Sequence, residues 1–228
     1  MNRFQNIQAV TFDVGGTLID PRPSVGHVYA EVAARHGLKN LSVEMLNRRF
    51  LAVWRAQPDL VQTKAAWAEI VDQVFLGLVE RPPSQTFFSE LYQRFSEPGA
   101  WHIYEDVLPA LKTLGARGLR LGVISNWDDR LRPLLSRLGL ANHFQTIVVS
   151  CEAGSAKPAP AIFQKAAGQL GMEGSVILHV GDSLEMDIQA AQSAGWSAVQ
   201  IIRKGVGVGE WQVTSLLDLS ALIGSGGH

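Results

Sequence analysis

Short apolar runs alternate with stretches of helical spacing over most of the chain. Each run is rich in β-branched residues and nearly continuous, which is typical of parallel strands buried on both faces. The predicted strands are 7–13, 119–125, 146–150, 176–181 and 198–203. Between the last four, apolar residues recur about every 3.6 positions, which predicts helices. These helices cover 107–116, 130–138, 159–170 and 186–194. Strands that alternate with helices predict an α/β fold with a doubly wound parallel sheet.

The segment 21–97 follows a different pattern, because it has no β-like run. Apolar residues at helical spacing predict amphipathic helices over 27–37, 43–54 and 67–79. Prolines and glycine bracket the segment at both ends. We therefore predict a core domain of residues 1–20 and 98–228, with an inserted helical cap domain of residues 21–97 whose two connections act as hinges. An alternative is that these helices pack on the sheet as one more layer.

The composition narrows the class of protein. The chain has 228 residues, of which 46% are hydrophobic and 18% charged, and its net charge is −1. A chain of this length can bury a core without disulfides, and without a basic excess nucleic-acid binding is not expected. No apolar run approaches the ~20 residues that span a bilayer, and the N-terminus lacks a secretory signal. We expect a cytoplasmic monomer or weak dimer.

Cys151, the only cysteine, is expected to be buried and inert. The C-terminal GSGGH is expected to be disordered.

Polar residues of one chemical kind stand where the predicted strands end. They are Asp13, Ser125 and Asn126, Lys157 in a following loop, and Asp182 after Gly181. In an open parallel sheet, ligands bind beyond the carboxyl ends of the strands. Carboxylates provide the hard oxygen ligands that Mg2+ prefers, and a lysine neutralises phosphate charge. This combination favours a site for a phosphoryl group and Mg2+.

Four segments resemble the motifs of the haloacid dehalogenase superfamily, in the order and spacing of that family. They are FDVGGTLID, Ser125 with Asn126, SCEAGSAKPAPAIF around Lys157, and HVGDSLEMDIQAAQSAG. The helical insertion resembles the C1-type cap of subfamily I, and the GGT form of the first motif is similar to that of the rhythmically expressed gene two-like branch. The resemblance covers the whole chain and implies a Mg2+-dependent phosphatase acting on a small phosphorylated molecule.

The resemblance also implies a role for individual residues. Asp13 would attack phosphorus and form an aspartyl-phosphate, while Lys157 would neutralise negative charge on both phosphate and nucleophile. Thr17, Ser125 and Asn126 would bind phosphoryl oxygens, together with Lys157. The metal ligands would be Asp13, the backbone carbonyl of Gly15, Asp182 and Asp187. For Glu152 and His179, which adjoin the motifs, we expect a supporting or structural role.

The chain departs from the family pattern at Gly15. Phosphatases of the family carry an aspartate there, whose carboxyl protonates the leaving oxygen and then activates water. Glycine keeps the backbone carbonyl and loses the acid–base group, which typically contributes ~10²–10⁴-fold to a rate. Acyl or aryl phosphates, whose leaving groups need no proton, would suffer least. Asp20 or His27 could replace the missing acid.

Other activities stay open at this point. A 2-haloacid dehalogenase uses the same nucleophile without the second aspartate, but lacks the Gly-Asp-x-x-x-x-Asp motif that is present at 181–187. A phosphonoacetaldehyde hydrolase would need a lysine in the cap, where the candidates are Lys39 and Lys64. A third alternative is a catalytically impaired protein that binds phosphate, a metabolite or a partner. Among the aromatic residues, Trp127 is the best candidate for a pocket wall, because it directly follows Ser125 and Asn126.

Overall fold

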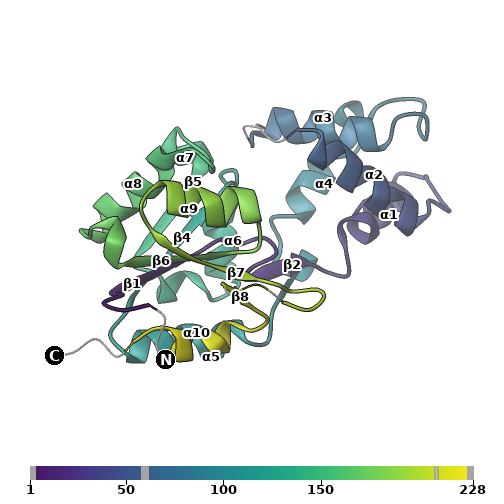
Figure 1. Cartoon of the computed structure of the whole chain (residues 1–228). Coiled ribbons are helices and arrows are strands. Elements are labelled where there is room, and N and C mark those ends of the chain that lie inside the picture. The colour runs from purple at the N-terminus through teal and green to yellow at the C-terminus, as the bar shows by residue number, and fades with distance from the viewer. Residues whose placement is uncertain (1–3, 58–61, 208, 210, 225–228) are drawn as a thin grey trace. The chain divides into compact units, whose positions relative to one another are not determined.

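The computed structural model describes residues 4–57, 62–207, 209 and 211–224. It divides into two compact units (Figure 1). The core unit consists of Met1–Ile19 and Ile103–His228, and the helical unit of Asp20–His102. Most of the GSGGH tail lies outside the described residues. That the helical unit acts as a cap remains a prediction.

Among the described residues of the core unit, six strands form one parallel sheet in the order β5-β4-β1-β6-β7-β8. The strands are β1 (Ala9–Phe12), β4 (Arg120–Ser125), β5 (Thr146–Val149), β6 (Ile177–Gly181), β7 (Ser197–Ile201) and β8 (Gln212–Val213). In this register Phe12 of β1 stands opposite Val123 of β4 and Val180 of β6. The chain reverses its direction of winding beside β1, where ligands bind in folds of this kind. The predicted doubly wound α/β fold is confirmed.

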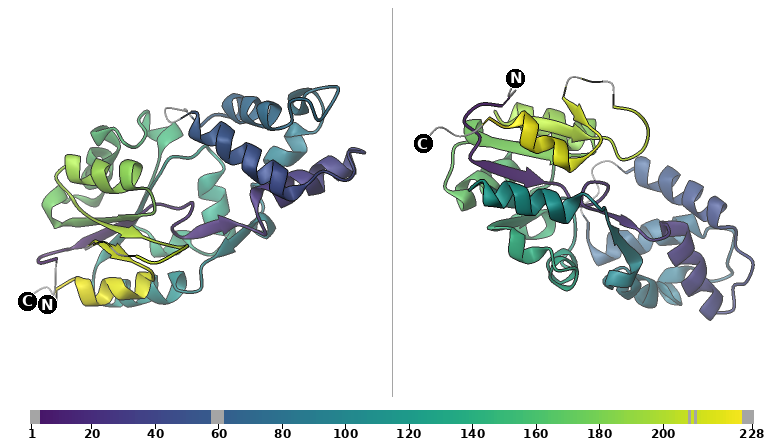
Figure 2. Two further views of the ribbon diagram at one scale, coloured as in Figure 1. Left: turned by 45° about the vertical axis from the view of Figure 1, so that its right-hand side comes forward. Right: turned by 90° about the horizontal axis from the view of Figure 1, so that it is seen from below.

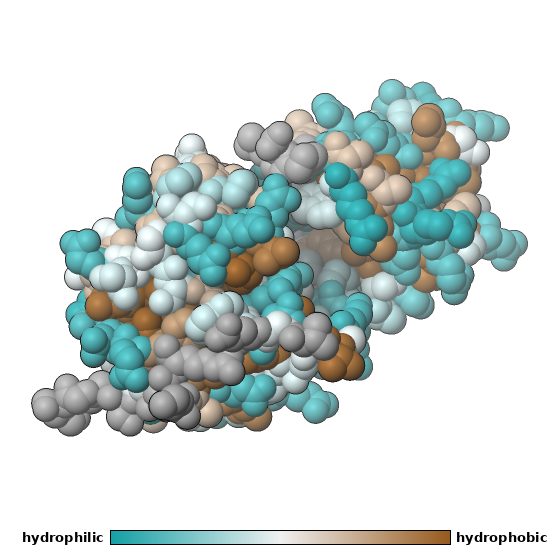
Figure 3. All heavy atoms as spheres, viewed as in Figure 1, coloured by the Kyte–Doolittle hydropathy of each residue, from teal (hydrophilic) through white to brown (hydrophobic). Residues whose placement is uncertain are grey.

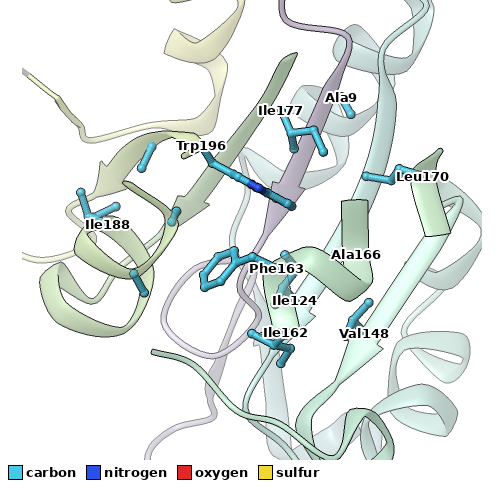
Figure 4. Close-up of a cluster of buried hydrophobic side chains, with 13 residues drawn as sticks. Ala9, Ile124, Val148, Ile162, Phe163, Ala166, Leu170, Ile177, Ile188 and Trp196 are labelled. Carbon is cyan, nitrogen blue, oxygen red and sulfur yellow. The ribbon is translucent and has the colours of Figure 1, made fainter. Parts of the chain in front are cut away.

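Helices cover both faces of this sheet. α5 (Val107–Ala116) and α10 (Leu219–Leu222) lie on one face, and α8 (Pro160–Leu170) and α9 (Ala190–Ser193) on the other (Figures 1 and 2). Between α8 and the sheet, Phe163 of α8 lies close to Trp196, with their ring centres 5.4 Å apart (Figure 4). This apolar cluster takes residues from five strands of the sheet, so it fixes the strands that carry the polar residues. α6 (Leu131–Arg137) and α7 (Ser150–Ala153) complete the set of α-helices in the described part of this unit.

The predicted helix 186–194 is interrupted. A π-helical segment, η5 (Leu184–Gln189), precedes α9, and the Ser183 hydroxyl accepts a hydrogen bond from the backbone N–H of Met186 at its start. Segments of this kind are rare and often occur at functional sites. Here the segment carries Asp187, one of the predicted metal ligands.

The helical unit contains α1 (Val25–Arg35), α2 (Val43–Arg55), α3 (Lys64–Val74) and α4 (Phe88–Arg94). Ser24, Ser42 and Thr63 cap the first three, since each side chain accepts a hydrogen bond from a backbone N–H of the first turn. The unit has its own core around Tyr29 and Phe75. Two strands that the sequence did not predict, β2 (Ile19–Pro21) and β3 (Trp101–Ile103), pair where the chain passes between the units. They are only three residues long, too short to show a periodicity.

Polar residues cover much of the visible face of each unit (Figure 3). Within the described ranges, no helix has the length and apolar character needed to cross a membrane. The prediction for Cys151 was wrong as to burial. The residue lies on the short helix α7 and its side chain is exposed. Partial desolvation and the nearby acids Glu152 and Asp128 raise the pKa of its thiol, so the reactive thiolate is disfavoured.

Candidate active site

The carboxyl ends of the three central strands bring the predicted site residues together. Asp13 directly follows β1, Ser125 is the last residue of β4, and Asp182 follows the last residue of β6. The Ser125 hydroxyl donates a hydrogen bond of 2.9 Å to Oδ1 of Asp13. Parallel pairing of β1 with both neighbours therefore places these side chains at one edge of the sheet.

Lys157 is the charged centre of the site. Its Nζ lies 2.6 Å from Oδ1 of Asp13 and 2.5 Å from Oδ1 of Asp187, and all three side chains are buried. Burial alone would lower the pKa of Lys157, but the two carboxylates outweigh that effect and raise it above its ordinary value. The lysine is therefore a fixed positive charge, held where a phosphoryl group beside Asp13 would need it.

The carboxylates respond differently to this environment. Burial would raise the pKa of Asp187, but Lys157 and the hydrogen bond from His179 lower it below the usual range. Burial raises the pKa of Asp13 despite the attraction of Lys157, and repulsion from Asp187 adds to the effect. Partial desolvation, followed by repulsion from the other two carboxylates, raises the pKa of Asp182 to about 7.

Asp13, Asp182 and Asp187 form a cluster of acids. One oxygen from each lies within 4.8 Å of the others. Two glycines make this approach possible. A Cβ atom on Gly16, whose φ is +74°, would stand 2.5 Å from Oδ2 of Asp182, and a Cβ on Gly181 would overlap Asp187. The glycines of the first and fourth motifs thus leave room for the carboxylates.

His179 supports Asp187 from within β6. Its ring is fully buried, with Nδ1 2.9 Å from the hydroxyl of Thr11 and Nε2 3.2 Å from Oδ1 of Asp187. Burial lowers the pKa of the imidazole, which favours the neutral form. In that form Nε2–H donates to the carboxylate and Nδ1 accepts from Thr11, which fixes the orientation of Asp187.

Thr17 lies in the turn after β1. The side-chain hydroxyl of Thr17 is buried and makes no hydrogen bond within the described structure. Buried polar groups are almost always satisfied by protein, water or a ligand, so this hydroxyl is available to donate. The backbone carbonyl of Thr17 is held by Arg203, whose Nε and Nη2 donate to it at 3.1 and 2.5 Å.

Arg203 was not predicted from the sequence. Its Nη1 pairs with both carboxylate oxygens of Asp106 at 2.9 and 2.8 Å, and its guanidinium lies 4.0 Å from the ring centre of Tyr104. Asp106 in turn accepts hydrogen bonds from Ser215 and from the backbone of Leu216. The signal in the sequence was a basic residue at the carboxyl end of a predicted strand, the edge where ligands bind.

Asn126 is paired with the backbone of Lys157. Its carboxamide donates to the backbone carbonyl of Lys157 and accepts from the backbone N–H of Lys157, both at 2.8 Å. This pairing favours a positioning role for Asn126, which holds the lysine loop. The predicted contact with phosphate remains a prediction.

Gly15 faces an aromatic ring. A Cβ atom on Gly15 would stand 3.4 Å from Cζ3 of Trp127, in ordinary van der Waals contact. The direction that the missing acid would take therefore leads toward the indole. That the Gly15 carbonyl binds metal remains a prediction.

The remaining candidates are Glu152 of the core unit and four residues of the helical unit. Glu152 is exposed and pairs with Arg132, in keeping with the structural role expected for it. Asp20, His27, Lys39 and Lys64 belong to the helical unit. His27 is exposed, with Nδ1 2.8 Å from the hydroxyl of Ser24, and both lysines are exposed. The core unit does not contain these four residues, so their part in the reaction remains a prediction.

Residues 7–195 match the family described as haloacid dehalogenase-like hydrolase. The chain belongs to this family. It is 34% identical over 207 residues to human haloacid dehalogenase-like hydrolase domain-containing protein 3, which covers 86% of the chain and 82% of the relative. It is 30% identical over 221 residues to a phosphoglycolate phosphatase from Yersinia pseudotuberculosis, which covers 96% of the chain and 90% of that enzyme.

Solved structures of this hydrolase family include proteins with two activities. A HAD phosphatase from Thermococcus onnurineus is 26% identical, with a TM-score of 0.70 over 96% of this chain and 99% of the other. A 2-haloacid dehalogenase from Pseudomonas syringae is 25% identical, with a TM-score of 0.67 over 95% and 97%. The overall fold therefore does not separate phosphatase from dehalogenase, and the residues of the site must do so.

Proposed function

We propose that this haloacid dehalogenase-like hydrolase is a Mg2+-dependent phosphatase that acts on a small phosphorylated molecule through an aspartyl-phosphate on Asp13. The observation that carries the proposal is the acid cluster around one buried lysine. Three carboxylates, Asp13, Asp182 and Asp187, face the single charge of Lys157. When all three are ionised they exceed the lysine by two negative charges, which one divalent cation would balance.

The donor set fits Mg2+. Oxygens bound to one Mg2+ ion at about 2.1 Å lie at most ~4.2 Å apart. The three carboxylates already offer oxygens within 4.8 Å of one another, so a small contraction would suffice. Asp13, Asp182 and Asp187 would hold the ion, together with the carbonyl of Gly15. When bound, Mg2+ supplies positive charge that draws the phosphoryl group toward the nucleophile.

The chain's own residues would perform the remaining steps. Ser125 and Lys157 hold Oδ1 of Asp13, so we assign the attack on phosphorus to Oδ2. The hydroxyl of Thr17 is available to donate to a phosphoryl oxygen, because it has no partner in the described structure. Lys157 offsets the charge of the phosphoryl group as it is transferred. Gly15 offers no acid, so departure of the leaving group without a proton is the step that limits the range of substrates.

The test is hydrolysis of p-nitrophenyl phosphate and acetyl phosphate, with Mg2+ and with EDTA. We expect turnover that EDTA abolishes and that Asp13→Asn reduces to background. Glu173→Gln is the matched control, because Glu173 is an exposed acid of the core unit. Metal-independent release of halide from a 2-haloacid would contradict the proposal and identify a dehalogenase.

The glycine at position 15 favours one other candidate, a protein that binds phosphate or a partner and has lost turnover. It would bind inorganic phosphate with Mg2+, through Lys157 and Thr17, and hydrolyse neither test substrate. Calorimetric titration with phosphate, run beside the turnover assay, distinguishes the two candidates.

A further inference from the structure

Trp127 lies in the same loop as two residues of the site. It follows β4 directly after Ser125, which contacts the nucleophile, and Asn126, which holds the backbone of Lys157. The indole is partly exposed, although Ser125 and Asp128 close beside it in the chain are buried. Trp127 is therefore a partly exposed aromatic residue two positions after Ser125, whose hydroxyl contacts the nucleophile.

The backbone of Trp127 is fixed on both sides. Its N–H donates to the hydroxyl of Ser150 at 3.0 Å. Its carbonyl accepts from the same hydroxyl at 3.1 Å and from the N–H of Cys151 at 3.3 Å. These bonds tie the loop to the start of α7 and set the point from which the indole projects.

The indole stands in the direction that a side chain at position 15 would take. The Cβ of such a side chain would lie 3.4 Å from Cζ3 of Trp127. In this chain a glycine and an indole therefore meet two residues beyond the nucleophile, where related phosphatases carry an acid. In the proposed reaction, an aromatic surface thus stands in the direction of the missing proton donor.

The absence of an acid at position 15 limits which leaving groups can depart. Asp13 forms the new oxygen–phosphorus bond, the bond from phosphorus to the ester oxygen breaks, and its electron pair leaves on that oxygen. Without an acid the oxyanion departs unprotonated and takes its proton from water, so it must be stable as an anion. Water then attacks the aspartyl-phosphate, releasing phosphate, regenerating the Asp13 carboxylate and giving up a proton to solvent.

Oxyanions that are stable without a proton are commonly conjugated and flat, like the surface that the indole presents. We propose that Trp127 is a specificity-determining residue and that the site prefers monophosphates of aromatic alcohols. Such a leaving group would pack against the indole, with the offset or edge-to-face geometry that aromatic pairs adopt. The inference rests on the proposed phosphatase activity and names the substrate class. Acyl phosphates also leave without a proton, but they need no aromatic surface, so they serve as the contrast.

Binding of two stable analogues tests the role of Trp127 without turnover. Phenylphosphonate and methylphosphonate carry the same phosphorus group and differ only in the aromatic ring. Their dissociation constants are measured by calorimetry with Mg2+ for wild type, Trp127→Leu and Trp127→Phe. Trp211→Leu is the matched control, since Trp211 packs against Phe4 and lies outside the site loops.

We expect wild type to bind phenylphosphonate about three- to tenfold more tightly than methylphosphonate, the range typical of an added aromatic contact. Trp127→Leu should bring this ratio close to one, Trp127→Phe should keep most of it, and Trp211→Leu should leave it unchanged. Circular dichroism establishes that each variant is folded. A ratio that is the same in wild type and Trp127→Leu overturns the inference, as does a wild type that binds neither phosphonate.

Failure of the inference is distinguishable from failure of the proposed function. If wild type hydrolyses both p-nitrophenyl and acetyl phosphate and the phosphonate ratio ignores Trp127, the phosphatase stands and the substrate class does not. If wild type hydrolyses neither phosphate, the phosphatase fails. In that case a phosphonate ratio that depends on Trp127 still identifies an aromatic binding surface.

Discussion

Replacing Arg203 by methionine tests whether this residue positions the turn that carries Thr17. The change removes the two hydrogen bonds to the carbonyl of Thr17 and the bidentate pair with Asp106. The side chains of Arg203 and Asp106 are 10% and 13% exposed, so solvent replaces these contacts only in part. Breaking a fully buried pair costs ~3–5 kcal/mol. Allowing for the residual exposure, we expect the free energy of unfolding to fall by ~2–4 kcal/mol.

Urea unfolding followed by circular dichroism measures this loss, which should lower the melting temperature by about 4–16 °C.

The pairing with Arg203 lowers the pKa of Asp106 although burial alone would raise it. Its contribution to stability is therefore present above the ordinary carboxylate pKa and lost as the pH falls through the lowered value. The methionine variant should lose part of this acid dependence, because the hydrogen bonds from Leu216 and Ser215 to Asp106 remain. The KM for p-nitrophenyl phosphate should rise more than kcat falls, because Thr17 is displaced in the free enzyme. Arg81→Met, at an exposed position, is the control. A stability change below ~0.5 kcal/mol, typical of a surface substitution, would refute this reasoning.

Two further predictions concern the acids of the site. Gly15→Asp should raise turnover of an alkyl phosphate such as ethyl phosphate by up to ~10²-fold. Acetyl phosphate should gain less, because its leaving group needs no proton and the acid would only activate the water of the second step. An unchanged rate on ethyl phosphate would show that the acid was not the missing group. Because the pKa of Asp182 is raised to about 7 in the metal-free protein, Mg2+ affinity should fall as the pH drops below that value and binding near pH 7 should release a proton. Calorimetry at pH 6 and 8 in buffers of different ionisation enthalpy measures both the Mg2+ affinity and the proton release. Asp182→Asn should remove the proton release. A Mg2+ affinity that is independent of pH would contradict the assignment of Asp182 as a metal ligand.

Local pattern was enough to predict most of the sheet and several helices. The helix predicted over 107–116 coincides with α5, and the strand predicted over 119–125 differs from β4 by one residue at its start. Both are predictable because burial on both faces of a sheet requires continuous apolar runs, and a helix on its surface requires one apolar stripe. The two-residue strand β8 was missed, since it is too short to carry any periodicity.

Some polar contacts of the site could also be predicted from local sequence motifs, and others could not. Asp13, Lys157 and Asp187 were predicted because their motifs occur at characteristic positions, and the structure brings them into contact. The pairing of Arg203 with Thr17 joins residues 186 apart in the sequence, and no local signal specifies such a partner. The interruption at η5 also escaped prediction, because a π-helical segment of six residues is too short to change the apolar pattern visibly.

The central position of β1 has a consequence for synthesis of the protein. Its four residues are all buried and apolar or β-branched, and the ribosome makes them before the other strands of the sheet. Their partners on one side come with β4 and on the other with β6, so Asp13 meets Ser125 and Lys157 only after 112 and 144 further residues. Until β6 has emerged, the nascent chain carries an apolar strand with an open edge, the kind of segment that aggregates or recruits chaperones. A message cut short before β6 would therefore yield a product that is inactive and also prone to aggregate.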